Sequence, residues 1–243
     1  MRKIALVSTL ALAAAAVASP AQADVITLNF EGIAPHGSET GVQILDYYNG
    51  GTSSNATTGT NYGVSFGSNA VVLCLDTPGV NCSNTSRGGF GDPNSQNAGL
   101  FFLNGSETFL NFDAGFDTGF AFNYASNNTP GSVSVYDGLN GTGNLLATIA
   151  LPVNAPGCTV DDFAAYCPFG PAGVAFAGTA KSISFGGVAN FIVFDDITFG
   201  SATPGGGGQV PEPATWAMML LGFGAAGAAL RRKRREEAAL AVG

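Results

Sequence analysis

The chain has 243 residues and a formal net charge of −8, from 9 basic and 17 acidic residues. Seven of the basic residues lie in its first three and last thirteen positions, so residues 24–209 contain 2 basic and 14 acidic residues and carry a net charge of −12. Such a body has no basic patch to replace the counterions of phosphate groups, which excludes nucleic acid as a partner, and it attracts cations instead. Its roughly 180 residues are enough for one domain with a hydrophobic core.

The first 23 residues have the three parts of a secretory signal peptide. Arg2 and Lys3 form a positively charged start, residues 4–17 form an apolar run, and Ala21 and Ala23 mark a small-residue cleavage site. We expect this segment to be an N-terminal helix that signal peptidase removes, so that the mature chain begins directly after it and is exported through the inner membrane. A retained N-terminal anchor is the alternative.

The body consists of short runs rich in Val, Ile, Leu and Phe, separated by turns rich in Gly, Asn, Ser and Thr. No part of it shows a sustained 3.6-residue repeat of apolar residues, so no helix is expected there. The runs predict strands at residues 25–31, 42–48, 62–67, 70–75, 100–103, 108–112, 120–124, 132–136, 145–151, 174–176, 182–185 and 191–199. Many short strands with Gly-rich turns predict an all-β domain, an antiparallel β-sandwich of jelly-roll type.

The last predicted strand is continuously apolar from Phe191 to Phe194, which indicates a central position with both faces buried. The sandwich is therefore expected to occupy residues 24–201 as one domain. Residues 202–210, which are rich in glycine, are predicted to be a flexible linker.

The four cysteines occur as two local pairs in the body, Cys74 with Cys82 and Cys158 with Cys167. Four cysteines permit three pairings, but an exported protein favours disulfides, and the short separations favour a bond within each pair. Zinc binding is the alternative, and the lack of a Cys-x-x-Cys spacing disfavours it.

The end of the chain has three parts followed by a short tail at residues 236–243. These parts are a box of Pro211, Glu212 and Pro213, an uncharged run at residues 214–230, and a basic cluster of Arg231, Arg232, Lys233, Arg234 and Arg235. A run of about 17 residues is at the lower limit for crossing a hydrocarbon core of about 30 Å, so a short transmembrane helix is predicted at about 214–230. Trp216 lies where an interfacial aromatic anchor is expected, and the basic cluster marks the cytoplasmic end. From hydropathy alone, a plain C-terminal tail anchor is the alternative.

This string resembles the PEP-CTERM sorting signal of Gram-negative bacteria that make exopolysaccharide. The resemblance rests on the Pro-Glu-Pro box, Trp216, the string Gly222, Phe223 and Gly224, and the basic cluster, in that order at residues 211–235. It implies that an exosortase recognises the tail in the membrane, cleaves near the box, and releases or re-anchors the protein outside the cell. Residues 236–243 are a departure, because members of this family usually stop soon after the basic cluster.

The body offers little support for catalysis. The single histidine, His36, lies in a Pro-His-Gly turn, and the body has no H-E-x-x-H motif and no G-x-x-x-x-G-K phosphate loop. We therefore expect a non-enzymatic protein. A carboxylate pair of a glycoside hydrolase is a distant alternative, because 14 acidic residues permit many combinations.

Six tyrosines are available for a sugar-binding face: Tyr47, Tyr48, Tyr62, Tyr124, Tyr136 and Tyr166. The body has no tryptophan, and half-buried packing is the expected role of tyrosine at strand positions. The first functional hypothesis is therefore a structural protein at the cell surface or in an exopolysaccharide-rich biofilm matrix. A lectin-like module that binds a glycan is the second.

Acidic residues occur on the first and last predicted strands, as Glu31 and the pair Asp195 and Asp196. The two terminal strands of a sandwich commonly lie side by side, which would bring these carboxylates together. Hard oxygen ligands without histidine favour Ca²⁺. The layout resembles jelly-roll extracellular modules, such as MAM-type and carbohydrate-binding domains, in which an early Glu and a late Asp hold a structural calcium. The alternative is surface aspartates at a strand bend.

Overall fold

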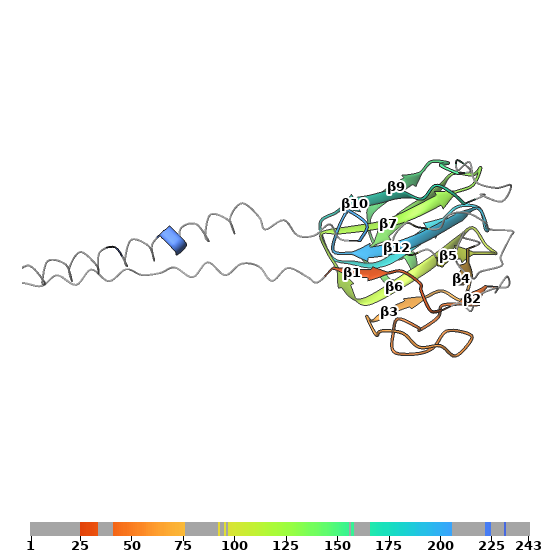
Figure 1. Ribbon diagram of the computed structural model, residues 1–243, viewed down its shortest axis with the longest axis horizontal. Coiled ribbons are helices and arrows are strands. Elements are labelled where there is room, and N and C mark those ends of the chain that lie inside the picture. Colours follow the sequence, from red (N-terminus) through yellow and green to blue (C-terminus); the bar gives the residue numbers. More distant parts are fainter. Residues whose placement is uncertain are drawn as a thin grey trace, which may run out of the picture.

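The computed structural model describes residues 25–33, 41–75, 92, 95, 97–155, 157, 166–205, 222–224 and 231. Within them, twelve strands form two antiparallel sheets that pack against each other, with one short 3-10 helix, η2 (Leu139–Gly141), in the body (Figure 1). The predicted all-β sandwich is confirmed.

The larger sheet has seven strands among the described residues. Six of them follow the order β10 (Gly170–Ala175), β7 (Gly119–Ser126), β12 (Ile192–Phe199), β5 (Ala98–Phe102), β4 (Ala70–Cys74) and β2 (Val42–Gln43), and β1 (Ile26–Leu28) pairs with β12. The smaller sheet has five, in the order β3 (Val64–Phe66), β6 (Glu107–Phe116), β11 (Ala180–Gly186), β8 (Gly131–Tyr136) and β9 (Leu145–Leu151).

Strand β12 is central in the seven-stranded sheet, as its apolar sequence predicts. One of its edges pairs with β7, from Ile192 to Phe199. Its other edge is shared, because β1 pairs with the residues from Ile197 to Phe199 and β5 pairs with Phe194. The first strand therefore turns away from β12 where β5 arrives.

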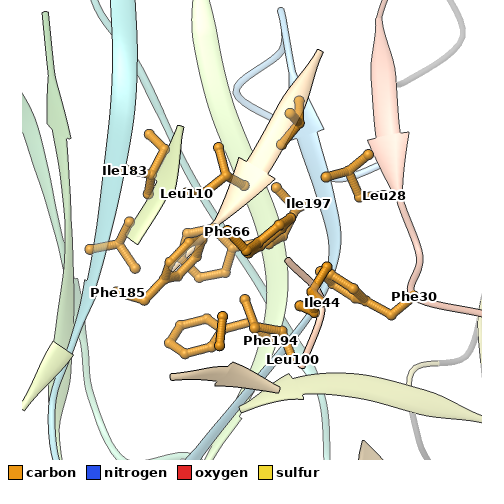
Figure 2. Packing of buried hydrophobic residues seen from close by; sticks show 14 of the residues in the cluster. Leu28, Phe30, Ile44, Phe66, Leu100, Leu110, Ile183, Phe185, Phe194 and Ile197 are labelled. Carbon is orange, nitrogen blue, oxygen red and sulfur yellow. The ribbon is translucent and has the colours of Figure 1, made fainter. Parts of the chain in front are cut away.

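The main core lies between the two sheets and is rich in aromatic rings (Figure 2). Buried side chains from the larger sheet include Leu100, Phe194 and Ile197, and those from the smaller sheet include Phe66, Leu110, Ile183 and Phe185. The rings of Phe185 and Phe194 meet edge to face across the two sheets, with centroids 4.8 Å apart. Aromatic pairs prefer this arrangement because the positive ring edge faces the negative ring face.

A second, smaller core covers the outer face of the seven-stranded sheet. It contains side chains from four neighbouring strands, among them Leu73, Phe101, Ala125 and Val193, together with Tyr166 from the segment before β10. The Tyr166 hydroxyl donates to the backbone oxygen of Asn190, which fixes that segment to the turn before β12. Every residue of β7 and of β12 is consequently buried.

Several strands differ in length from the prediction. The predicted strand 42–48 is reduced to β2, because Leu45 has a φ of 51° and the chain continues through turns. Strand β6 extends to Phe116, and β10 begins at Gly170, four residues before the predicted start. The apolar side chains of Ile44, Tyr47 and Tyr48 still enter the main core, but from turns.

The two ends of the body lie at the same end of the sandwich, which we call the tail end. Ile26 pairs with Phe199, so the first strand starts where the last strand finishes. Strand β12 starts at the opposite, far end, where the connections at residues 103–106, 127–130, 152–155 and 187–191 meet. Figure 1 shows β1 and β12 side by side in the larger sheet.

Candidate functional site

A bulge interrupts β12 at its two acidic residues. Asp195 pairs with Asn123 of β7 and Thr198 pairs with Ala121, so Asp196 and Ile197 together oppose a single residue of β7. Asp196 has a φ of 48°, in the left-handed region that Asp tolerates better than most residues. Side chains of a strand point alternately to its two faces, and the extra residue shifts this alternation by one position. The side chains that point into the main core are therefore Phe194 before the bulge and Ile197 after it.

The two carboxyl groups at this bulge are buried, although neither belongs to a hydrophobic cluster. Asp195 is 0% exposed and Asp196 is 4% exposed. The Ser95 hydroxyl lies 2.9 Å from Asp195 Oδ2 and 3.2 Å from Asp196 Oδ1. Asn123 Nδ2 lies 3.5 Å from Asp196 Oδ2. A hydroxyl and an amide therefore hold the pair in place.

Local backbone bonds also fix the bulge. The backbone N–H of Asp196 donates to Asp195 Oδ1 over 2.7 Å, and the Thr198 hydroxyl donates to the Asp196 carbonyl over 2.8 Å. The side chains of Asp195 and Thr198 thus stabilise the positive φ of Asp196.

The electrostatics of the site disfavour a charge on Asp195. Burial, the neighbouring carboxyl group of Asp196 and that of the fully buried Asp92 raise the pKa of Asp195 well above its usual value, against the hydrogen bonds from Asp196 N–H and Ser95. A buried carboxylate is costly because it loses its hydration. The cluster can lower this cost by binding a proton or a cation.

Glu31 lies just after β1 and is held by a different partner. Its carboxylate accepts from the Asn97 backbone N–H over 2.9 Å and from Asn97 Nδ2 over 2.5 Å. Asn97 lies two residues after Ser95, which bonds both aspartates, so a single segment before β5 contacts all three predicted ligands. The Phe30 N–H donates to the Tyr48 hydroxyl over 3.0 Å, which fixes the turn that carries Glu31.

The predicted calcium site stays a prediction. In the part of the chain that the structure describes, no group of three or more His, Cys, Asp or Glu side chains is arranged to hold a metal ion. Asp195 and Asp196 supply the hard oxygen atoms that Ca²⁺ favours, and the Ser95 hydroxyl adjoins them. The carboxylate of Glu31, the third predicted ligand, accepts its hydrogen bonds from Asn97.

Four residues of this site were not found from the sequence: Asp92, Ser95, Asn97 and Asn123. The first three precede β5 in a segment without apolar periodicity, so nothing in their spacing indicates a buried position. Asn123 did give a signal, because it is the one polar residue in the run from Phe120 to Tyr124. It is 8% exposed and faces the outer side of the sheet, beside Asp196.

The tyrosines do not form a sugar-binding platform. Tyr47, Tyr48, Tyr124 and Tyr166 are buried, and Tyr62 and Tyr136 are half-buried. The expected packing role is confirmed. The Tyr124 hydroxyl, for example, donates to the Pro152 carbonyl over 3.1 Å.

Several predicted sites lie wholly or partly outside the described residues. Cys74 and Cys167 are disulfide-bonded, and Cys82 and Cys158 lie outside that part, so the pairing stays a prediction. The cleavage-site residues Ala21 and Ala23 also lie outside it.

Of the sorting tail, only Gly222, Phe223, Gly224 and Arg231 are described, and all four are helical and exposed. Among the described residues no helix is long and apolar enough to cross a membrane, and the predicted span at 214–230 falls mostly outside them.

Comparison with known families identifies the tail. Residues 209–235 match the PEP-CTERM protein-sorting motif. The chain therefore carries this motif, which indicates an exported protein that is sorted to the cell surface. No similar sequence was found among curated proteins.

Comparison with solved structures gives only distant likenesses. A family 6 carbohydrate-binding module is 17% identical, with a TM-score of 0.32, over 56% of this chain and 84% of that one. A carbohydrate-binding module from Clostridium stercorarium, solved with cellobiose, is 20% identical, with a TM-score of 0.32, over 56% and 84% of the two chains. An arabinoxylan arabinofuranohydrolase of glycoside hydrolase family 43 from Bacillus subtilis is 17% identical, with a TM-score of 0.35, over 54% and 24% of the two chains. We draw no functional conclusion from similarity this distant.

Proposed function

We propose that the chain is a precursor whose β-sandwich body is exported and then separated from its tail by an exosortase. The observation that carries this proposal is the sorting motif, which begins at residue 209, soon after the sandwich. The pairing of Ile26 with Phe199 supports it, because both ends that are to be processed leave the same end of the body. A single membrane-facing end of the sandwich would then serve both cleavages.

In this proposal the mature body is a non-enzymatic part of the cell surface or of an exopolysaccharide-rich biofilm matrix. The burial of the seven-stranded sheet on both faces makes the body rigid, and a net charge of −12 keeps it soluble. Asp195 and Asp196, at 0% and 4% exposed, are closed to a polymeric substrate. This closure argues against that pair as the acid and base of a hydrolase.

Intact-mass analysis of the protein from cells that make an exosortase tests the proposal. The expected product begins after residue 23 and lacks Arg231 through Arg235. A surface product that keeps the basic cluster would contradict exosortase processing, and one that keeps Met1 would contradict the signal peptide.

A structural Ca²⁺ held by Asp195, Asp196 and Glu31 is a further part of the proposal. A divalent cation would relieve the repulsion between two adjacent buried carboxyl groups. Calcium at about 100 times its dissociation constant stabilises a folded protein by about 2.7 kcal/mol. We expect the melting temperature of the mature protein to rise with calcium and to fall on chelation.

The variants for this test are Glu31→Gln and, as a control, Asp113→Asn, which changes an exposed residue of the other sheet. Glu31→Gln should lose most of the calcium-induced rise, and Asp113→Asn should keep it. A melting temperature that does not respond to calcium would remove the metal from the proposal.

Glycan binding is the second candidate function, and the far end of the sandwich favours it. The connections at 103–106, 127–130, 152–155 and 187–191 contain no charged residue, although the body carries −12. They are joined by backbone bonds, such as Asn127 N–H to the Phe191 carbonyl at 2.8 Å and Gly187 N–H to the Ser106 carbonyl at 3.0 Å. These four connections, which we call the far-end surface, are therefore fixed to one another and uncharged, and Glu107 lies beside them at the start of β6.

This far-end surface exposes both apolar and amide groups. Val153 and Val188 are each 45% exposed, Phe191 is 36% exposed, and the Asn128 side chain is also exposed. Amides exchange hydrogen bonds with sugar hydroxyls, and apolar side chains cover the C–H faces of a sugar ring. A neutral polysaccharide is the glycan class that this surface suits.

A double variant, Val153→Ser with Val188→Ser, tests this candidate against Leu145→Ser. Leu145 is 56% exposed but lies on β9, outside the far-end connections. We expect the double variant to bind neutral polysaccharides at least about fivefold more weakly, because the lost contacts are apolar. Equal binding by all three proteins would exclude the far end as the site.

A further inference from the structure

The chain does not leave the sandwich as a free linker after β12. Residues 200–205, which we call the strap, fold back along the tail end of the larger sheet. Gly200 N–H donates to the Gly119 carbonyl over 3.0 Å, and the Thr118 hydroxyl donates to the Gly200 carbonyl over 2.9 Å. Gly205 N–H donates to the Thr198 hydroxyl over 2.9 Å. The predicted linker 202–210 therefore starts with residues that are attached to the sheet.

Two glycines on neighbouring strands leave room for the strap. A Cβ atom on Gly119 of β7 would lie 2.7 Å from the Ala202 nitrogen. A Cβ atom on Gly173 of β10 would overlap the Ala202 carbonyl oxygen and would also lie 2.8 Å from the Cβ atom of Ala121 on β7. Neither glycine has a positive φ, so the lack of space, and not the backbone conformation, requires the missing side chain. The strap limits this space at both positions, and Ala121 limits it further at Gly173.

The strap sets the distance between the folded body and the sorting motif. The motif begins at residue 209, so only residues 206–208 separate it from Gly205. Three extended residues span at most about 10 Å. If the strap detaches, residues 200–208 are free and span about 30 Å.

We propose that the strap controls exosortase access to the tail by holding the sandwich close to the sorting motif, so that either detachment of the strap or a longer tether speeds cleavage. This inference rests on the exosortase processing proposed above. A cleaving enzyme must bind an extended stretch of chain around the scissile bond, and a sandwich held within about 10 Å of the motif obstructs it. Ala202, Thr203 and Gly205 are exposed, and few bonds hold the strap, so it belongs to the parts of a fold that open most readily.

The rate of processing should then follow the fraction of molecules whose strap is detached. Gly173→Ala places a methyl group against Ala202 and should raise that fraction. Gly170→Ala on the same strand is the matched control, because its Cβ would meet only the end of a side chain, Asn154 Nδ2 at 3.3 Å. A second variant inserts two glycines between Gly207 and Gly208, which lengthens the tether and leaves the body unchanged.

The experiment follows the full-length chain in exosortase-producing cells by pulse-chase and measures hydrogen exchange of the Gly205 amide. We expect Gly173→Ala to lose protection at Gly205 and to be processed at least about threefold faster, as a shift of population predicts. The insertion should speed processing to a similar degree with the strap still protected, and Gly170→Ala should match the wild type.

Two outcomes would overturn the inference in distinguishable ways. If Gly173→Ala loses protection and the insertion lengthens the tether, yet both are processed at the wild-type rate, the strap has no control over access. If Gly173→Ala fails to fold, the insertion variant alone decides. If the wild-type chain keeps Arg231 through Arg235 in these cells, the exosortase proposal itself fails, and the role of the strap fails with it.

Discussion

Asp195 is a carboxyl group without exposed surface that lies next to a second carboxyl group. The pKa of Asp195 is raised well above 3.8 by burial first, and then by Asp196 and Asp92. The folded chain therefore binds this proton more tightly than the unfolded chain does. Its contribution to stability is fully present below the unfolded pKa and is lost as the pH rises through the folded pKa.

The expected result concerns the free energy of unfolding without divalent cations. The stability of the wild type, relative to Asp195→Asn, should fall as the pH rises from about 4 to about 8, with a slope of at most about 1.4 kcal/mol per pH unit for one proton. Asn keeps the shape and an acceptor for Asp196 N–H, and it removes the titration. Chemical denaturation at a series of pH values, with chelator present, measures the difference.

Asp137 provides a control of opposite sign. Hydrogen bonds from the side chain and the backbone of Asn144 lower the pKa of Asp137. Its contribution is present above its usual pKa and is lost as the pH falls, so the stability of the wild type relative to Asp137→Asn should not decline toward neutral pH. A difference between the wild type and Asp195→Asn that does not change with pH would contradict the raised pKa of Asp195.

The sequence predicts the candidate site only in part, and the reason lies in its contacts. Asp195 and Asp196 stand out as acids in an otherwise apolar strand, and Glu31 stands out at the end of the first strand. Asn97 and Ser95 do not stand out, because their roles depend on contacts with residues far away in sequence, Glu31 and Asp195. The positive φ of Asp196 belongs to a bulge in the pairing of β12 with β7, which no local pattern shows.

At the scale of elements, β12 is buried on both faces by two different cores. Its inner face carries Phe194, and its outer face carries Val193, which is 0% exposed in the second core. A sandwich strand with one solvent-facing side would tolerate a polar residue at Val193. Strand β12 should not tolerate a polar residue there, because both of its faces are buried.

We expect Val193→Ser to lower the free energy of unfolding by about 2 to 3 kcal/mol, because it removes a buried apolar side chain and buries a hydroxyl. Val188→Ser is the control, since Val188 is 45% exposed in the turn before β12. It should change stability by no more than about 0.5 kcal/mol. Equal effects of the two substitutions in urea denaturation would mean that the second core contributes nothing.

The strands that the sequence predicts best are those with a strong local pattern. Residues 182–185 and 191–199 correspond closely to β11 and β12. The run at residues 42–48 is apolar enough for a strand, but Leu45 and the turns after it deliver Ile44 and Tyr48 to the core individually. Apolar content predicts burial there, and it does not distinguish a strand from a turn that packs on the core.

At the scale of the whole molecule, charge and chain ends divide the sandwich into two regions. The tail end carries both termini of the body and the strap. The four connections at the far end have no charge, while the body as a whole carries −12. A body tethered at its tail end therefore presents these four uncharged connections outward, with Glu107 beside them at the start of β6.

This division predicts how the mature body responds to charged and neutral polymers. A neutral polysaccharide should retard it in affinity electrophoresis to the same extent at low and high salt, since the far-end surface has no charge to screen. A polyuronate should not retard it at low salt, because charges of like sign repel over a Debye length of about 30 Å at 0.01 M. Calcium could bridge the two anions, so chelator is present throughout. Stronger binding to the polyuronate at low salt would show that Lys181 or Arg87 forms a cationic site, and it would move the binding surface away from the far end.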